Sequence, residues 1–403
     1  MAHGAVSRRE PRDQPSTMSS GVKNLVLLGG GHSHLAVLKH FGAASPSPAV
    51  RLTLVSKSVV TPYSGMLPGM IAGHYSPDAA HIDLPTLARF AGARAVFDEA
   101  VDLDLDRRHV LLRDLPPVAY DVLSIDVGST PSLVPGAAEH AVPIKPIDHL
   151  VRRWTSLVDR LRAGAAKQRV AVVGGGAAGV EIILAVQFRL RALLKHAGEH
   201  ATHFEYHLFT DSSDILPTYN WSVRRIFGRV LRERHITVHS GTAVTEVAHG
   251  RLRTADGVWH EANEVLWSTE AAAAPWLARA GLAVDRAGFV SVSSTLQSIS
   301  HPDVFAAGDI ASMVDYPRER SGALAVQQGP WLASNLRNAL RGEPLTPHRP
   351  RRRSLSVIST GNRYAVASYG PLACEGKWVW RWKDRRDHRF MRAYTELTPP
   401  MHA

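Results

Sequence analysis

The sequence predicts an α/β fold in which two doubly wound units, the first of them discontinuous, precede a small α+β C-terminal domain. Two stretches, 24–41 and 169–186, repeat one pattern: a short apolar run, then three glycines, then apolar residues at helical spacing. This pattern predicts a strand, a tight turn and a helix in each copy. A third apolar run, 301–310, also ends on a glycine and predicts one more strand of the first unit. The length of 403 residues accommodates two or three domains.

Composition and charge exclude several classes of protein. With 45% hydrophobic and 21% charged residues, the chain is neither disordered nor fibrous. The formal net charge of +11 is concentrated after residue 347, where twelve Lys and Arg stand against four Asp and Glu. Because the body of the chain is nearly neutral, we expect no nucleic-acid partner. No run reaches the roughly 18 to 20 apolar residues that a membrane-spanning helix needs.

The N-terminus and the cysteine count bear on the compartment. Residues 1–20 are polar and have no hydrophobic segment of the kind found in secretory signals, so we expect a disordered N-terminal extension, with a true start at Met18 as the alternative. Cys374 is the single thiol, which excludes an intramolecular disulfide, a CxxC pair and a Cys-rich zinc site. None of the 21 histidines lies in an HExxH motif, so we expect no metal. A cytoplasmic protein is predicted, with peripheral contact to the inner membrane surface as an alternative.

The glycines of the two turns match the requirements of Rossmann-like dinucleotide binding. In such a turn the first glycine permits the bend, the second lets the backbone approach a diphosphate, and the third lets the helix pack against the strand. The second copy is complete, with Gly174, Gly176 and Gly179. The first copy has Gly29 and Gly31, but His34 stands where the third glycine belongs. Two copies in the same strand–helix context predict two dinucleotide sites.

The tips of the second strands are expected to contact the ribose groups. A carboxylate usually ends that strand and binds the ribose hydroxyls. Here the strand of the first unit ends at Ser56 and Lys57, and that of the second unit ends at Thr210 and Asp211. Neither tip carries the expected Glu, so the sequence does not distinguish NADH from NADPH.

Two further strand ends complete the first unit. The run 301–310 places Gly308 and Asp309 at the carboxyl edge of a sheet, where the carboxylate can accept a hydrogen bond from a polyol such as the ribityl chain of a flavin. An Asp capping a strand end is the simpler alternative. The run 120–129 closes on Gly128 and Ser129 and marks where the chain leaves the first nucleotide domain for the second.

Together these motifs resemble the two-dinucleotide-binding flavoproteins of the pyridine nucleotide–disulfide oxidoreductase superfamily, in its type II NADH dehydrogenase-like branch. The stretches GGGHSH, TPYSGMLPG, LSIDVGSTP and WVWRWKD look like the FAD-dependent oxidoreductase that is found fused N-terminal to selenide, water dikinase. The resemblance implies four parts: a disordered extension at 1–20, an FAD-binding domain at 21–145 and 288–345, an NAD(P)-binding domain at 146–287, and a C-terminal interface domain at 346–403.

The same resemblance assigns cofactors, FAD and either NADH or NADPH, to individual positions. The residues expected to hold FAD are Gly29, Gly31, His32, Ser33, His34, Ser56, Lys57, Pro62, Tyr63, Gly128, Gly308, Asp309 and Gln328. The residues expected to hold NAD(P)H are Gly174, Gly176, Ala177, Gly179, Thr210 and Asp211. Pro62, Tyr63 and Met66 are expected to form a wall beside the flavin, although a tyrosine in a loop is more often simple packing.

The chemistry expected from this resemblance uses no redox disulfide. Disulfide reductases carry a reactive cysteine pair after the first unit, but 61–69 holds no thiol. Three catalytic candidates remain. Glu181 is expected near the nicotinamide, or is merely a polar residue in the first turns of a helix. Lys145 either faces the flavin, pairs with Glu181, or is a surface lysine at the domain crossover.

Gln327, the third candidate, and the neighbouring Gln328 are expected to hydrogen-bond the flavin carbonyls or a quinone, with an exposed helix face as the alternative. Ala323 stands where type II NADH dehydrogenases usually carry a glutamine. The acceptor is therefore open at this point.

The C-terminal part is predicted as a hairpin, a strand and a basic helix. Two apolar runs flank 361–363, which predicts the hairpin. Trp378, Trp380 and Trp382 alternate with other residues, which predicts three indoles on one strand face, followed by a basic helix. Indoles beside cations suit a membrane interface. A homodimer interface, or packing over the flavin, is the alternative.

We therefore expect an FAD-dependent NAD(P)H oxidoreductase that passes electrons to a quinone-like or other small acceptor. A reductase of a selenium or sulfur compound is one alternative. A flavin-binding redox sensor or interaction module is another.

Overall fold

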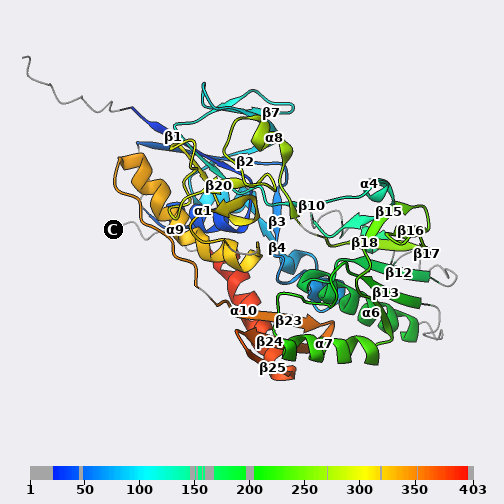
Figure 1. Ribbon diagram of the computed structural model, residues 1–403. Coiled ribbons are helices and arrows are strands. Elements are labelled where there is room, and N and C mark those ends of the chain that lie inside the picture. The colour runs from blue at the N-terminus through cyan, green and yellow to red at the C-terminus, as the bar shows by residue number, and fades with distance from the viewer. Residues whose placement is uncertain are drawn as a thin grey trace, which may run out of the picture.

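The computed structural model describes residues 21–397, apart from 45–48, 146–149, 151–152, 157, 159–167, 197–203, 270, 318–319 and 352. The N-terminal extension predicted at 1–20 lies outside the described residues. Two five-stranded parallel sheets are the largest sheets of the described chain, and an antiparallel sheet lies in its C-terminal part (Figure 1). This arrangement confirms the predicted α/β class.

The first sheet has five parallel strands in the spatial order β21-β9-β1-β2-β5. Their bounds are β1 (Lys23–Leu28), β2 (Val50–Ser56), β5 (Arg94–Phe97), β9 (Val122–Ile125) and β21 (Val304–Ala306). Leu28 is in register with Val55 on one side and with Ile125 on the other, so the carboxyl ends of three strands are level. Because β21 follows the whole second sheet along the chain, the first unit is discontinuous.

Helices α1 (His32–Gly42) and α9 (Gly322–Arg341) pack against each other along this sheet (Figure 1). The smaller elements of the first unit are β3 (Val60–Pro62), α2 (Leu67–Ile71), β4 (His81–Asp83), α3 (Leu84–Phe90), β6 (Ala100–Asp104), β7 (His109–Leu112), β8 (Val118–Ala119), α8 (Pro275–Arg279), β20 (Val290–Val292), the 3-10 turn η3 (Gly308–Ile310) and β22 (Ala311–Met313). Another 3-10 turn, η1 (Asp78–Ala80), precedes β4.

The second sheet repeats the parallel design in the order β11-β18-β12-β13-β14. Its strands are β11 (Val142–Pro143), β12 (Gln168–Val173), β13 (Phe204–Phe209), β14 (Ile236–His239) and β18 (Glu264–Trp267). Helices α6 (Ala177–His196) and α7 (Trp221–Glu233) cover one face. The other face is covered by α4 (Ala137–His140) and by the antiparallel strands β15 (Val244–Ala248), β16 (Arg251–Thr254) and β17 (Trp259–Glu261).

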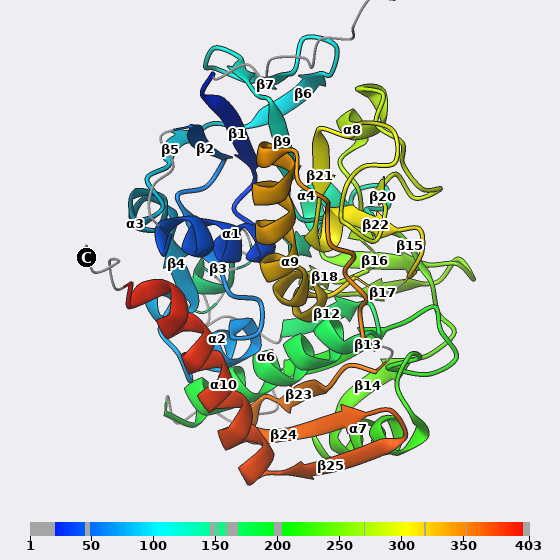
Figure 2. The same cartoon turned by 90° about the vertical axis from the view of Figure 1, so that its left-hand side faces the viewer.

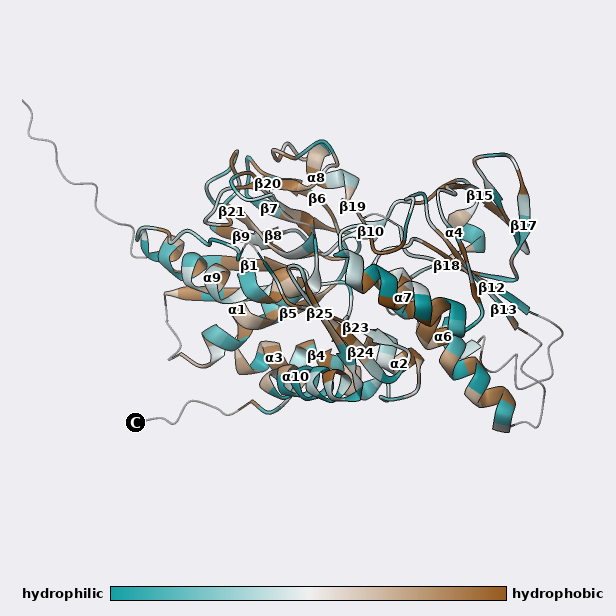
Figure 3. Cartoon of the chain, turned by 60° about the horizontal axis from the view of Figure 1, so that its bottom comes forward, coloured by the Kyte–Doolittle hydropathy of each residue, from teal (hydrophilic) through white to brown (hydrophobic). Residues whose placement is uncertain are grey.

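Two short strands, β10 (Thr130–Pro131) and β19 (Ala271–Ala272), pair between the two parallel sheets. Hydropathy follows this layering: the strands at the centre of each sheet are hydrophobic, whereas α7 alternates between hydrophobic and hydrophilic residues (Figure 3). Most buried side chains of the two parallel sheets belong to one continuous core. A smaller core lies under the β15–β17 strands.

The C-terminal part consists of β23 (Ser356–Thr360), β24 (Asn362–Tyr369), β25 (Leu372–Gly376) and α10 (Lys377–Thr395). The antiparallel pairing of β23 with β24 confirms the predicted hairpin. The predicted strand through the three tryptophans is wrong, because helix α10 already begins at Lys377. On a helix, Trp378 and Trp382 share a side and Trp380 points away from them, where Arg363 lies over its ring. Figure 2 shows α10 running from the end of β25 past α2, and the helix packs on β24, the central strand of the C-terminal sheet, and contacts β4.

Candidate active site

The first glycine turn, at Gly29 to Gly31, contacts the residues that directly follow β9. The Gly29 amide donates to the Val55 carbonyl (2.7 Å), and the Gly31 amide donates to the Asp126 carbonyl (3.1 Å). Gly29 has φ +98°, and a side chain there would overlap the backbone of Asp126 and Val127. Glycine is therefore required where β1 turns into α1. The first turns of α1 consequently lie at the level carboxyl edge of the sheet.

His34 is buried in the sheet–helix interface, where a third glycine was expected. One ring nitrogen, Nδ1, lies 2.6 Å from the Gly29 carbonyl, and the other, Nε2, lies 2.8 Å from the Ser124 hydroxyl. Burial lowers the pKa of His34 to about 4, so the ring is neutral at physiological pH. Because a carbonyl only accepts, Nδ1 carries the proton, and the Ser124 hydroxyl donates to Nε2. His34 thus ties α1 to β9 through its side chain.

The second glycine turn is built as the fingerprint demands. The Gly174 amide donates to the Phe209 carbonyl (2.8 Å). A side chain at Gly174 would overlap the Ser268 carbonyl, and one at Gly179 would overlap the Gly174 carbonyl. Gly176 is exposed and has open space where a side chain would be. The turn therefore presents accessible backbone at the start of α6, as a diphosphate site requires.

Asp126 is a site residue that sequence reasoning did not assign to a ligand. Its side chain is 2% exposed, and its Oδ2 accepts from the amides of Ser33 (2.8 Å) and His34 (3.1 Å) in the first turn of α1. Side chains at Gly31 or Gly308 would overlap its carboxyl group. Burial, with a contribution from the charge of Asp309, raises the pKa of Asp126 to about 7. The available signal was an acid directly after a fully buried strand.

Asp309 and Lys145 form an ion pair beside this turn. The Lys145 Nζ lies 2.5 Å from Asp309 Oδ2, so Lys145 pairs with Asp309 and not with Glu181. The second oxygen of Asp309 is shielded from solvent and has no hydrogen-bond partner within the described chain. The same holds for His32 Nε2 and Ser129 Oγ.

These polar atoms can be satisfied by a polyhydroxylated ligand that carries a diphosphate, so the residues fit FAD. Burial lowers the pKa of His32 to about 4. A neutral imidazole at the start of α1 offers a hydrogen bond to such a ligand without adding a charge.

The two glutamines of α9 differ in environment. Gln328 is 1% exposed, and its Oε1 accepts from the Gly308 amide (2.8 Å). It therefore holds the end of β21 against α9. Gln327 is exposed on the same helix and is free to meet a ligand.

The loop after β3 is covered by α10. The Tyr63 ring stacks on Phe390 with centroids 4.2 Å apart, and the Tyr63 hydroxyl donates to Asp387 Oδ1 (3.2 Å). Met66 is fully buried, whereas Pro62 is partly exposed. The wall predicted beside the flavin therefore has a layer of α10 behind it.

At the strand tips predicted to contact ribose, the Ser56 hydroxyl donates to the Ser58 carbonyl (2.9 Å) and closes a tight turn that includes Lys57. In the second unit, the buried Thr210 fills the space beside Gly175, and Asp211 is exposed at the strand tip. Both tips lie at the carboxyl edges of their sheets, as predicted from the strand pattern.

Glu181 belongs to a polar cluster between α6, β23 and α10. Its Oε1 accepts from the Ser359 amide (2.5 Å). Nearby, the Lys383 Nζ donates to the Gly65 carbonyl (2.5 Å) and to Asp387 Oδ2 (2.6 Å). Burial raises the pKa of Glu181 and of Asp387, and the charge of Lys383 opposes both shifts. Sequence reasoning missed Lys383 and Asp387, although their spacing of four residues is that of a helical ion pair.

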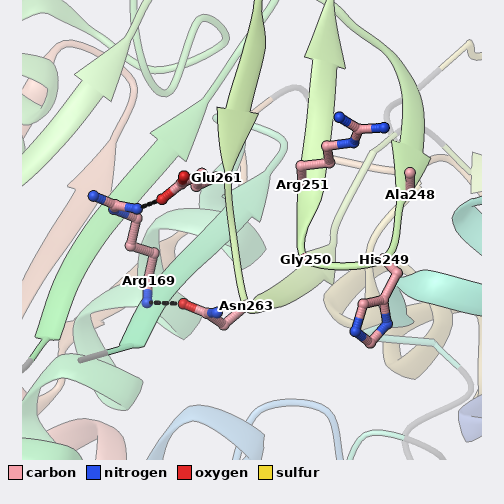
Figure 4. A pocket seen from close by; sticks show the side chains of 7 residues that line it. All are labelled: Arg169, Ala248, His249, Gly250, Arg251, Glu261 and Asn263. Carbon is pink, nitrogen blue, oxygen red and sulfur yellow. Dashed lines mark hydrogen bonds and ion pairs between the residues drawn. The ribbon is translucent and has the colours of Figure 1, made fainter. Parts of the chain in front are cut away.

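A surface hollow lies at the opposite end of the second sheet. Figure 4 shows its lining: Arg169, Ala248, His249, Gly250, Arg251, Glu261 and Asn263. Arg169 is near the amino end of β12 and pairs with Glu205 and Glu261. Ligands of open α/β sheets bind at the carboxyl ends of the strands. This hollow is therefore separate from the site at the glycine turns.

Comparisons with known proteins agree with this geometry. The sequence profile of the family described as pyridine nucleotide-disulphide oxidoreductase matches residues 23–332. The NADH dehydrogenase-like protein YutJ of Bacillus subtilis is 24% identical over 358 residues, which cover 87% of this chain and 93% of YutJ. The type II NADH:quinone oxidoreductase NdhA of Mycobacterium tuberculosis is 25% identical and covers 90% of this chain and 84% of its own length. The solved structure of NDH2 from Plasmodium falciparum in complex with NADH superimposes with a TM-score of 0.77 at 15% identity, covering 93% and 98% of the two chains.

Proposed function

The chain belongs to the pyridine nucleotide-disulphide oxidoreductase family, and from this premise we propose that it reduces a quinone-like acceptor with electrons from NAD(P)H, without a redox disulfide. It is an NAD(P)H oxidoreductase that binds FAD and a nicotinamide nucleotide. The acceptor and the residue roles are our proposals. The observation that carries them is the pair of glycine turns at two carboxyl sheet edges, together with the absence of a thiol from 61–69 of the first unit.

The first turn is the proposed FAD site and the second the NAD(P)H site. Bound FAD would supply the redox chemistry between the nicotinamide and the acceptor. In the first unit, His32, Ser129 and Asp309 offer their unpartnered atoms to the flavin nucleotide. Lys145 keeps the Asp309 side chain in place through their ion pair. In the second unit, Gly176 and the start of α6 receive the nicotinamide diphosphate.

The acceptor is proposed to approach the cluster of Glu181, Lys383 and Asp387. Reduction of a quinone by two electrons consumes two protons, so an acceptor site needs groups that hold and release protons. Tyr63 and Asp387 share a hydrogen bond, and Lys383 binds Asp387 from the next helical turn. The names of relatives such as NdhA support a quinone as the acceptor. Gln327, exposed on α9, is the proposed contact to the acceptor or to the flavin carbonyls.

A peripheral contact with an anionic membrane surface is proposed for the outer face of α10. Trp378 is 59% exposed, and the exposed Arg381, Arg385, Arg389 and Arg392 follow it at helical spacing. No helix within the described residues is long and apolar enough to cross a bilayer. A surface indole with arginines along one helix face suits the headgroup region. The alternative occupant of this face is a second copy of the chain.

Spectroscopy tests the redox proposal directly. The purified full chain is expected to be yellow, to bleach anaerobically with NADH or NADPH, and to regain its colour when a short-chain quinone is added. A flavin that neither nucleotide bleaches would favour a sensor or interaction module. Reoxidation by a polysulfide or selenium compound, with quinones inert, would favour the alternative reductase; Cys374, exposed on β25, is the only thiol for such chemistry.

Liposome flotation tests the membrane proposal. Wild-type protein is expected to float with vesicles containing phosphatidylglycerol, and the double variant Arg381→Glu/Arg385→Glu is expected to stay behind. Arg107→Glu is the matched control, because Arg107 is 82% exposed in the turn between β6 and β7, far from α10 (Figure 2). Equal flotation of wild type and double variant would contradict the proposal, and a concentration-dependent dimer would favour the second copy.

A further inference from the structure

The first glycine turn contains an ionisable carboxyl group of its own, that of Asp126. Dinucleotide diphosphates bind at the start of the helix that follows a glycine turn, where backbone amides and the helix dipole favour negative charge. In α1, the amides of Ser33 and His34 are already engaged by Asp126 Oδ2, at 2.8 and 3.1 Å. Asp126 is 2% exposed, so water hardly screens the charge of its carboxyl group when it is ionised. An ionised Asp126 would therefore share one helix terminus with the diphosphate of bound FAD, and the two negative charges would repel.

The backbone around Asp126 leaves room for its side chain. A side chain at Gly31 or Gly308 would overlap the carboxyl group, so two glycines from separate elements leave room for it. The second unit shows the alternative. There, Ser268 occupies the equivalent position, because its carbonyl faces Gly174 as the Asp126 carbonyl faces Gly29. The negative charge is thus a feature of the FAD turn and not of the nucleotide fold in general.

We propose that Asp126 makes FAD binding depend on protonation: the first turn binds FAD tightly while the Asp126 carboxyl group is neutral and more weakly once it is ionised. The inference rests on the FAD site of the proposed function. Like charges at close range in a poorly solvated site repel strongly. Ionisation of Asp126 therefore works against the diphosphate, and binding of the diphosphate favours uptake of a proton by Asp126.

The groups around Asp126 leave it as the one that titrates near neutral pH. From η3 it faces Asp309, whose negative charge is balanced by Lys145. From α1 it faces His34 and lies near His32, and burial lowers the pKa of both rings to about 4. Both rings therefore stay neutral above pH 5.5. The pKa of Asp126 itself is raised to about 7 by its burial, which places the change within the physiological range.

Equilibrium binding of FAD to deflavinated full-length protein tests this inference, with flavin fluorescence as the readout. Between pH 5.5 and 8.5 the Kd of wild type for FAD is expected to rise at least about tenfold, since a repulsion of this kind is worth at least one factor of ten at short range. Asp126→Asn keeps the shape of the side chain and removes the charge. It is expected to bind FAD with an affinity that hardly changes over the same range. NADH affinity, measured on the loaded protein, is the internal control and should respond equally to pH in both proteins.

Proton uptake gives a second readout that needs no variant. Calorimetry of FAD binding at pH 7 in two buffers of different ionisation enthalpy should show uptake of a fraction of a proton by wild type. Asp126→Ser, which copies the second unit, replaces Asp126→Asn if the amide variant does not fold, and it should show no uptake. A Kd of wild type that is constant from pH 5.5 to 8.5, or the same pH dependence in the variants, would overturn the inference. Absence of FAD binding at every pH would instead refute the proposed function.

Discussion

The two glycine turns have the same backbone path but use different side chains at the third position. In the second turn, α6 comes so close to the strand that only hydrogen fits at Gly179, against the Gly174 carbonyl. In the first turn, that same carbonyl, from Gly29, receives a hydrogen bond from the ring of His34, which also reaches Ser124 on β9. One site solves the helix–strand contact by close approach and the other by inserting a polar ring.

The difference teaches that the third glycine is a packing solution and not a chemical requirement. A helix that lies slightly farther from its strand leaves a gap, and a gap in a core must be filled. An imidazole with both nitrogens satisfied fills it without cost to the buried carbonyl. The incomplete fingerprint of the first unit therefore does not weaken the assignment of a nucleotide site there.

Restoring the glycine fingerprint in the first turn is expected to have the largest effect, and it is destabilising. His34→Gly leaves a cavity and places a glycine inside a helix. It also removes the hydrogen-bond partner of the buried Gly29 carbonyl and of the Ser124 hydroxyl. We expect a loss of about 3 kcal/mol or more in the free energy of unfolding, measured by urea denaturation. A variant as stable as wild type would show that the ring is not part of the packing.

The converse change in the second turn is expected to be smaller and to act on one nucleotide only. Gly179→Ala forces a Cβ against the Gly174 carbonyl, and overpacking of this kind costs about 1–3 kcal/mol. We expect KM for NAD(P)H to rise several-fold while the FAD content stays at the wild-type level. Loss of FAD together with NAD(P)H affinity would mean that the two turns are not independent.

The sequence was sufficient for the parallel sheets and for both turns, because strand, glycine and helix are local patterns. It was insufficient for α10. The face of α10 that packs inward is formed by Val379, Lys383, Asp387 and Met391, one residue per helical turn. Two of these four are charged, so the inward face shows no apolar helical period. Trp378, Trp380 and Trp382 alternate with other residues, and this period of two predicted a strand where the chain forms a helix.

The contacts of Glu181, Lys145 and Asp126 could not be read from the sequence for another reason. Each lies at a junction of segments that are far apart along the chain: Glu181 meets Ser359, Lys145 meets Asp309, and Asp126 meets the start of α1. Such pairs follow from how whole sheets are placed, and no spacing in the sequence encodes them. The contact of Lys383 with Gly65 was missed for the same reason, whereas its spacing of four residues from Asp387 was masked by the strand predicted through the tryptophans.

Acid pH is expected to separate the buried groups of the first turn. The pKa of His34 is about 4 in the folded chain and about 6.5 when unfolded, so its stabilising contribution is present above pH 6.5 and is lost as the pH falls to 4. For one such group the slope is about 1.4 kcal/mol per pH unit. Asp126, with a raised pKa, acts oppositely: its contribution is present at acid pH and is lost as the pH rises towards 7.

Urea denaturation at pH 5 and pH 6.5 therefore ranks the variants by how much free energy of unfolding each loses on acidification. Relative to wild type, His34→Gln should lose less stability on acidification, and Asp126→Asn should lose more. His239 in the second unit also has a pKa lowered to about 4, by partial burial and by the neighbouring His207 and His260, but it is more accessible to solvent. His239→Gln should therefore change the acid loss less than His34→Gln does. The reverse order would place the acid-sensitive element in the second unit.

The ion pair of Lys145 with Asp309 is expected to give the smallest effect. Lys145 is 39% exposed in its side chain, so solvent screens the pair and Lys145→Met should change the free energy of unfolding by less than about 1 kcal/mol. The charge of Lys145 also helps to lower the pKa of His32, whereas the charge of Asp309 raises it.

In Lys145→Met the charge of Asp309 is unopposed, so the pKa of His32 should rise from about 4. Imidazole carbon shifts in a pH titration by NMR measure this change, with the resonance of His34 as the internal reference. An unmoved His32 would mean that burial alone holds that ring neutral, and the charge pair would then serve only to orient Asp309.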